Sequence, residues 1–112
     1  MTALSGTERR AQQAFERHVL GHVVALGGAD GSAPIETVEQ AIGYYRHAAA
    51  GNPAQQALAR RLRAAVAALY EQALLDSAAP PETYRPTAAG RDLVEHNRQT
   101  WWRRALAAMR PR

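Results

Sequence analysis

Basic side chains gather at the C-terminal end of the chain, around the adjacent residues Trp101 and Trp102. The last sixteen residues contain no acidic side chain and hold Arg98, Arg103, Arg104, Arg110 and Arg112. Guanidinium groups make bidentate hydrogen bonds with phosphates and carboxylates, and indole rings offer flat surfaces for stacking. This pattern predicts binding to an anion-rich partner, without bond making or breaking.

A second basic cluster, formed by Arg60, Arg61 and Arg63, falls in the first half of an expected helix that begins at Pro53. The positive end of a helix dipole disfavours cations, so helix stability does not explain this cluster. One interpretation is an ordinary solvated helix face. The other is that this helix packs beside the C-terminal helix, so that both clusters form one positive strip along which several phosphates bind.

Histidine is the other residue type whose spacing could support chemistry. His18 and His22 are four residues apart, a spacing that binds a metal when a third ligand joins them. The chain has no cysteine, and His47 and His96 would have to converge from other helices. We therefore expect ordinary histidines, with no metal and no cofactor.

No arrangement of nucleophile and base is evident in the sequence. Serine occurs only at Ser5, Ser32 and Ser77, and none has a partner pattern of histidine and acid around it. The carboxylates Glu36 and Glu39 are interpreted as a solvated acidic helix face, which could meet a basic neighbouring subunit. The glycines at 27–31 lack the lysine and the preceding strand of a phosphate-binding loop. An enzyme is not predicted.

The composition indicates one small domain with a positive C-terminal third. The chain has 112 residues and a net charge of +4, with no lysine, so all fourteen basic residues are arginines. Residues 80–112 hold seven arginines and three acids, which accounts for the whole net charge. A small basic protein favours polyanionic partners. No apolar run suits a signal peptide or a membrane span, so we expect a cytoplasmic protein with no membrane partner.

Glycine and proline divide the first half of the chain into helical segments, and no segment alternates as a strand does. Ser5 and Glu8 form a capping box for a first helix, which the glycines at 27–28 should end. A second helix is expected to begin at Pro34 and to end at the Gly-Asn-Pro turn at 51–53. Its expected apolar stripe is Ile35, Val38, Ile42, Tyr45 and Ala49.

The second half of the chain predicts two longer helices. Asn52 should cap a third helix with Pro53 in its first turn, and its apolar seam is Leu58, Leu62, Ala65, Val66, Leu69 and Ala73. Residues 77–86 are rich in proline, which predicts a connector between helices. A fourth helix begins between Thr87 and Asp92 and ends near Met109. Together these segments predict an all-α fold: a compact bundle of about four helices in a single domain over 1–112, with a basic C-terminal helix at about 88–109 and a short tail.

Helical spacing separates the two tryptophans of the C-terminal helix. Leu93, Val94 and Trp101 belong to a broad apolar arc, and Trp102 lies nearer its rim. We therefore expect Trp101 in the core and Trp102 at the surface, where it could pack on a base or a partner.

In its size, helical character and arginine content, the chain resembles the small helical-bundle subunits of CRISPR effector complexes. The resemblance rests on architecture, on Arg60, Arg61 and Arg63, and on Trp102, Arg103 and Arg104. It implies a subunit of a larger ribonucleoprotein assembly that contacts a nucleic-acid backbone without reading sequence and meets neighbouring protein subunits. It leaves open whether the nucleic acid is RNA or DNA and whether the protein self-associates.

The same residues support a second hypothesis. In this alternative the protein is an adaptor or inhibitor whose basic C-terminal helix docks on an acidic protein, with Trp102, Arg103 and Arg104 supplying most of the binding energy. A third possibility, an amphipathic helix on anionic lipid, ranks last because its alanine-rich apolar face is needed for the core.

Overall fold

The structure, a computed structural model, describes residues 5–109, which form four α-helices, a short 3₁₀-helix and two very short strands. Along the chain these are α1 (Gly6–Ala25), β1 (Ala33–Pro34), α2 (Ile35–Ile42), η1 (Arg46–Ala48), α3 (Pro53–Glu71), β2 (Thr83–Tyr84) and α4 (Ala88–Met109). The predicted all-α fold, a bundle of about four helices, is confirmed. No helix within the described range has the length and apolar character needed to cross a membrane.

Three helices begin where their capping residues predict. The Ser5 side chain accepts a hydrogen bond from the backbone N–H of Glu8 at 3.1 Å, which satisfies a donor that the first turn of α1 leaves free. Asn52 does the same for Gln55 at the start of α3, at 3.2 Å. At α4 the cap is the earlier of the two candidates, because Thr87 Oγ1 accepts from the backbone N–H of Gly90 at 3.0 Å.

The expected length of the second helix is wrong. Its apolar stripe continues in the sequence to Ala49, but α2 ends at Ile42 because Gly43 takes a left-handed conformation with φ of +102°. The Gln55 side chain of α3 then accepts from the N–H of Tyr45 at 2.8 Å and donates to the carbonyl of Gly43 at 3.0 Å. These contacts hold the chain after α2 against α3, and they leave Tyr45 exposed instead of in the core.

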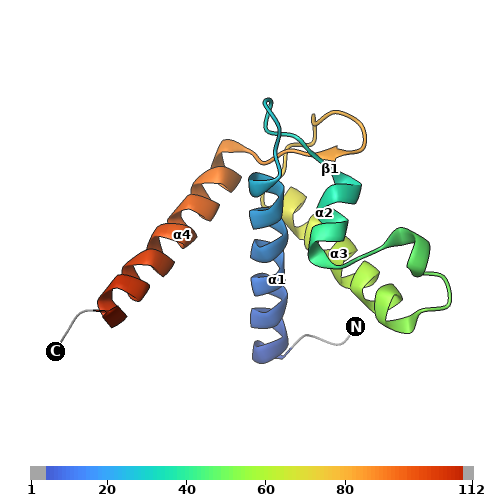
Figure 1. The fold of residues 1–112 in the computed structure, drawn as a ribbon, viewed down its shortest axis with the longest axis horizontal. Helices are drawn as coiled ribbons and strands as arrows, with labels where there is room; N and C mark the ends of the chain where they lie inside the picture. Colours follow the sequence, from blue (N-terminus) through green and yellow to red (C-terminus); the bar gives the residue numbers. More distant parts are fainter. Residues whose placement is uncertain (1–4, 110–112) are drawn as a thin grey trace.

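The core lies where α1, α2 and α3 meet the segments around the two short strands. It is made of Val19, Leu20, Val23, Ala33, Val38, Leu62, Ala65, Leu69, Leu74, Leu75 and Tyr84. Helix α1 packs against α2 and α3 and also, elsewhere along its length, against α4 (Figure 1). The central position of α1 therefore places α3 and α4 on different sides of it.

A small sheet that the sequence did not predict joins the loop before α2 to the connector before α4. Ala33 pairs with Tyr84, and Pro34 pairs with Thr83, in antiparallel register. A further bridge between Leu75 and Pro86 closes the connector on itself. Strands of two residues are too short for a periodic signal, which explains why the pattern of the sequence did not indicate them.

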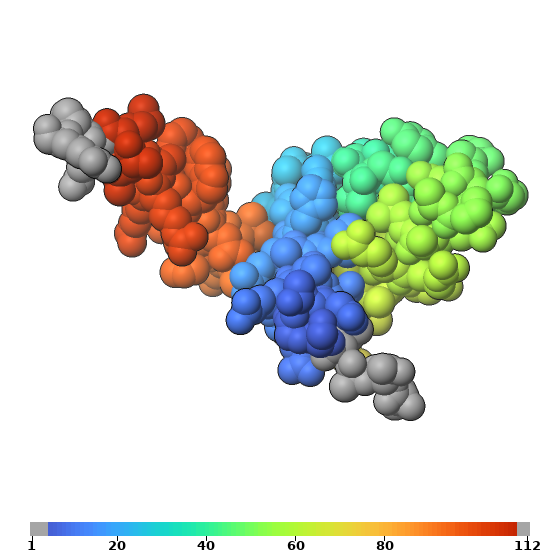
Figure 2. Space-filling view, turned by 90° about the horizontal axis from the view of Figure 1, so that it is seen from below, coloured from blue at the N-terminus to red at the C-terminus, as the bar shows by residue number. Residues whose placement is uncertain are grey.

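Helix α4 is anchored at its beginning and free along the rest of its length. Leu93 and Val94 pack against the core, and Gly90 is buried. Beyond these turns the helix leaves the bundle, as Figure 1 and the space-filling view in Figure 2 both show. The extents of the described molecule, 53 × 37 × 27 Å, reflect this projection.

Candidate docking surface on α4

The base of α4 is fixed by close contacts with the segment that follows α3. Thr87 Oγ1 donates a hydrogen bond to the carbonyl of Ala73 at 2.6 Å, and the Thr87 N–H donates to the carbonyl of Leu74 at 3.1 Å. Gly90 lies directly over that Leu74 carbonyl, so closely that a Cβ atom at position 90 would overlap its oxygen. The direction in which α4 leaves the bundle is therefore set by contacts of Thr87 and Gly90 with the backbone of Ala73 and Leu74.

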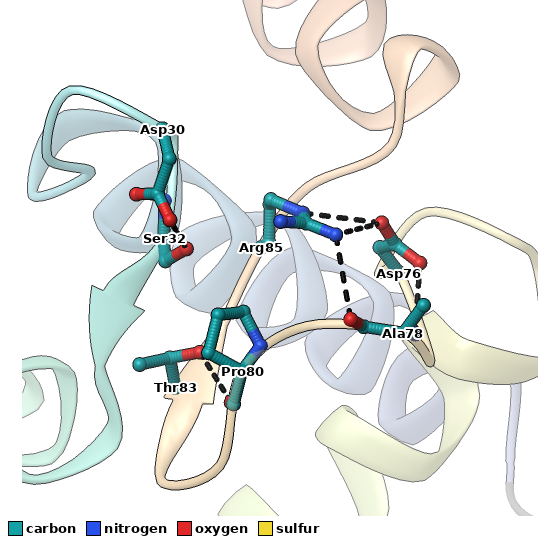
Figure 3. Close-up of polar contacts among 7 residues, drawn as sticks. All are labelled: Asp30, Ser32, Asp76, Ala78, Pro80, Thr83 and Arg85. Carbon is teal, nitrogen blue, oxygen red and sulfur yellow. Dashed lines mark hydrogen bonds and ion pairs between the residues drawn. The ribbon is translucent and has the colours of Figure 1, made fainter.

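Side-chain contacts in the connector support this base (Figure 3). The Arg85 guanidinium donates to Asp76 Oδ2 at 2.8 and 3.1 Å, and Thr83 Oγ1 donates to the carbonyl of Pro80 at 2.6 Å. A hydrogen bond from the N–H of Ala78, together with the Arg85 guanidinium, holds the pKa of Asp76 below its ordinary value. The connector is thus cross-linked by polar contacts between its own residues.

Large apolar side chains cover one side of the C-terminal half of α4 and meet solvent. Trp101 is 63% exposed, Trp102 51%, Leu106 56% and Met109 76%. The two indole rings touch edge to face, with their centroids 5.2 Å apart. An exposed apolar surface of this kind on a small protein is typical of an interaction site.

The prediction that Trp101 lies in the core is wrong. Gly90, Val94, Asn97 and Trp101 follow one another at spacings of three and four along the helix, so they share one row. Burial decreases along this row, from a buried Gly90 through half-buried Val94 and Asn97 to an exposed Trp101. The spacing identifies the correct side of the helix, but α4 has no neighbour at the level of Trp101.

Arginines border this apolar side on both edges. Arg103 is three residues from Leu106 and lies along one edge, Arg104 is three residues from Trp101 and lies along the other, and Arg98 lies within the apolar side. All three side chains are exposed, and none forms an ion pair with another residue in the range 5–109. Arg110 and Arg112, which the sequence placed in the same cluster, lie outside the described residues, as does Pro111.

The second basic cluster does not extend this surface. A continuous positive strip required α3 and α4 to lie side by side, and α1 lies between them instead (Figures 1 and 2). The Arg61 guanidinium stacks over the ring of Phe15 on α1, 4.4 Å from its centroid. Arg63 lines a cavity beside α2, and Arg60 is exposed. The hypothesis of one strip made by both clusters is wrong.

The histidine pair on α1 forms an aromatic contact. The rings of His18 and His22 meet edge to face with centroids 4.6 Å apart. Burial, and to a lesser degree the neighbouring His18, lowers the pKa of His22 below 6.5. Among residues 5–109 no group of three or more potential ligands is close enough to hold a metal ion.

Sequence reasoning missed a buried charge on α2. Glu36 is exposed as expected, but Glu39 is only 8% exposed, and its Oε1 accepts a hydrogen bond from Arg46 Nε at 2.6 Å. Had α2 continued, Arg46 would have lain two turns beyond Glu39. The pair forms because Gly43 ends the helix and turns the chain back, which helical periodicity alone did not indicate.

Comparisons of this chain with protein-family models, with curated proteins and with solved structures give no match.

Proposed function

We propose that the protein is a non-catalytic adaptor whose helix α4 docks into a groove of an acidic protein partner. The observation that carries this proposal is the exposed apolar side of α4, which contains Trp101, Trp102 and Leu106 and has no neighbour within residues 5–109. A helix that presents anchors at spacings of three and four suits recognition by an apolar groove. Tryptophan and arginine are also the residue types that dominate binding energy at protein interfaces.

The charges around this surface specify the partner. Arg103 and Arg104 lie on opposite edges of the apolar side, so a complementary groove carries carboxylates on both rims. Arg98, within the apolar side, fits an acidic or hydrogen-bonding group on the groove floor. Because the base of α4 is fixed by Thr87 and Gly90, the helix is held in place before binding, which lowers the entropy that binding must overcome.

A second candidate function is binding to a nucleic-acid backbone within a CRISPR-like ribonucleoprotein assembly. The observation that favours it is the pair of exposed indole rings beside Arg98, Arg103 and Arg104, since bases stack on indoles and guanidinium groups neutralise phosphates. It ranks second because the basic cluster on α3 does not join that of α4, and because Leu106 and Met109 add an aliphatic surface that phosphates do not need.

Affinity capture of the tagged protein from its native cells, with and without nuclease, separates the two functions. The adaptor proposal predicts a stoichiometric acidic protein that nuclease does not remove. Trp101→Ser with Leu106→Ser, and separately Arg103→Glu with Arg104→Glu, should abolish this capture. These side chains are exposed, so each change should leave thermal stability within about 0.5 kcal/mol of the wild type.

The matched control for the charge reversal is Arg60→Glu, an exposed arginine on α3 away from the proposed surface. It should leave capture unchanged. Nucleic-acid binding would instead show as nuclease-sensitive capture, and as a slope of log affinity against log salt of about −3 to −4 if four phosphates are neutralised. A slope of that size for the purified protein, lost in Arg103→Glu with Arg104→Glu, would replace the adaptor with the second candidate.

A further inference from the structure

A cavity of about 150 Å³ opens between α2, α3 and β2, on the other side of α1 from the free half of α4. Ala59, Leu62 and Val66 of α3 supply its apolar wall. A cavity of this volume holds a molecule about the size of a benzene ring. Nothing in the docking role proposed for α4 uses this cavity.

One side of the cavity carries the carboxylate of Glu39, which has one oxygen engaged and one oxygen free to accept a hydrogen bond. Glu39 Oε1 is engaged by Arg46 Nε at 2.6 Å, and within residues 5–109 its Oε2 atom has no hydrogen-bond partner. Within residues 5–109 the one buried side-chain atom without a partner is Gln12 Nε2, so Glu39 Oε2 is open to solvent and can accept further hydrogen bonds. The free oxygen therefore suits an N–H group of a bound molecule.

A second polar group on the same side is the hydroxyl of Tyr84. Burial, followed by the charge of Glu39, raises the pKa of Tyr84 to about 12. The phenol thus stays protonated at neutral pH and can donate a hydrogen bond. The half-buried Tyr44 also lines the cavity.

Arg63 of α3 brings a positive charge to the edge of the cavity. Arg63 lines it, and Arg63 forms no ion pair with a residue of the described range. Glu39 already pairs with Arg46, so Arg63 is left without an anionic partner in the described range, and the carboxylate group of a ligand can pair with it. The cavity thus combines a free carboxylate oxygen of Glu39, the guanidinium group of Arg63, which has no ion-pair partner in the described range, and an apolar wall.

We propose that this cavity binds a free α-amino acid whose aliphatic side chain is no larger than a benzene ring. The ligand ammonium group donates to the free oxygen of Glu39, and its carboxylate accepts from Arg63 and the Tyr84 hydroxyl. Its side chain packs on Leu62 and Val66. A plain carboxylate would leave the Glu39 oxygen without a donor, and a plain amine would leave Arg63 without an anionic partner.

Amide chemical shifts of the full chain, followed by NMR during titration, test this proposal with three probes. The probes are L-leucine, its analogue without the amino group (4-methylpentanoate) and its analogue without the carboxylate (isopentylamine). We expect L-leucine to bind most tightly and to shift the amides of α3 and β2 around the cavity. Arg63→Gln should weaken leucine binding about tenfold, the loss expected for one charge-assisted contact, and should leave isopentylamine binding unchanged.

Arg60→Gln is the matched control, because Arg60 is an equally exposed arginine on α3 that does not line the cavity. It should leave the affinity for all three probes as in the wild type. The proposal is overturned if leucine causes no shift around the cavity at about 10 mM. It is equally overturned if Arg60→Gln and Arg63→Gln have the same effect, or if Arg63→Gln weakens isopentylamine as much as leucine.

Discussion

Adding one methyl group at the base of α4 should destabilise the protein, although the same change normally strengthens a helix. Glycine in a helix interior is about 0.5–1 kcal/mol less favourable than alanine. At Gly90, however, the new Cβ would overlap the carbonyl oxygen of Leu74, a backbone atom that cannot rotate away. The carbonyl also accepts the hydrogen bond from the N–H of Thr87 that fixes the helix start.

The magnitude follows from three contributions. Forcing a methyl group into a filled site costs about 1–3 kcal/mol, and weakening the Thr87–Leu74 hydrogen bond costs about 0.5–1.5 kcal/mol. The gain in helix propensity offsets about 1 kcal/mol of this. Gly90→Ala should therefore lower the free energy of unfolding by about 0.5–3.5 kcal/mol, which corresponds to a fall in Tm of about 2–14 °C for a domain of this size.

Gly21→Ala is the matched control for this substitution. Gly21 lies in the interior of α1, and a Cβ there would have no atom within 4 Å, so propensity alone decides the outcome. It should raise the free energy of unfolding by about 0.5–1 kcal/mol. Urea denaturation followed by far-ultraviolet circular dichroism measures both variants. A Gly90→Ala protein that is as stable as Gly21→Ala would refute the close packing of α4 on the Leu74 carbonyl.

Three further predictions concern the body of the protein. Leu20→Ala should reduce the free energy of unfolding by about 2–5 kcal/mol in urea denaturation, because Leu20 is fully buried. Arg61→Gln should cost about 0.5–1 kcal/mol through loss of its stacking on α1, whereas Arg60→Gln should leave stability unchanged, and equal effects would contradict the stacking. Because burial lowers the folded-state pKa of His22, the unfolded chain binds a proton more readily, so stability should fall as the pH drops below about 6.5. His22→Gln should flatten that fall when stability is measured between pH 7.5 and pH 5, and an unchanged slope would show that His22 does not cause it.

Local signals predicted much of the fold because they act over a few residues. The caps at Ser5, Asn52 and Thr87 depend on one side chain and an N–H three positions away, so the sequence contains the whole interaction. The end of α2 was missed for the opposite reason. The apolar stripe of the sequence continues past Gly43, so the pattern does not indicate that α2 ends there. Contacts with Gln55 then decide the path that the chain takes.

The candidate site shows the same division between local pattern and tertiary arrangement. The sequence identified Arg98, Arg103 and Arg104 as part of a basic cluster, and periodicity placed Trp101 on the side of α4 that faces the bundle at its base. Periodicity could not show where α1 stops covering that side. The exposure of Trp101, like the separation of the two arginine clusters, follows from how far neighbouring helices reach.

The cavity beside α2 lay beyond sequence reasoning altogether. It depends on Glu39, Arg63 and Tyr84, which come from a helix, a second helix and a two-residue strand. Glu39 belongs to a segment with the composition of a solvated face, and only the turn at Gly43 brings Arg46 to it. Its burial could be recognised only once these elements were placed together.

Site-specific photo-crosslinking in the native cells tests the docking role of α4 most directly. A photoreactive amino acid replaces Ala105, near the middle of the apolar side, or Ala107, which lies two residues on and on the opposite side of the helix. The account predicts that position 105 crosslinks to one acidic protein, in a product that nuclease leaves unchanged, and that position 107 does not. Crosslinking to nucleic acid, equal products from both positions, or no product from position 105 would contradict it.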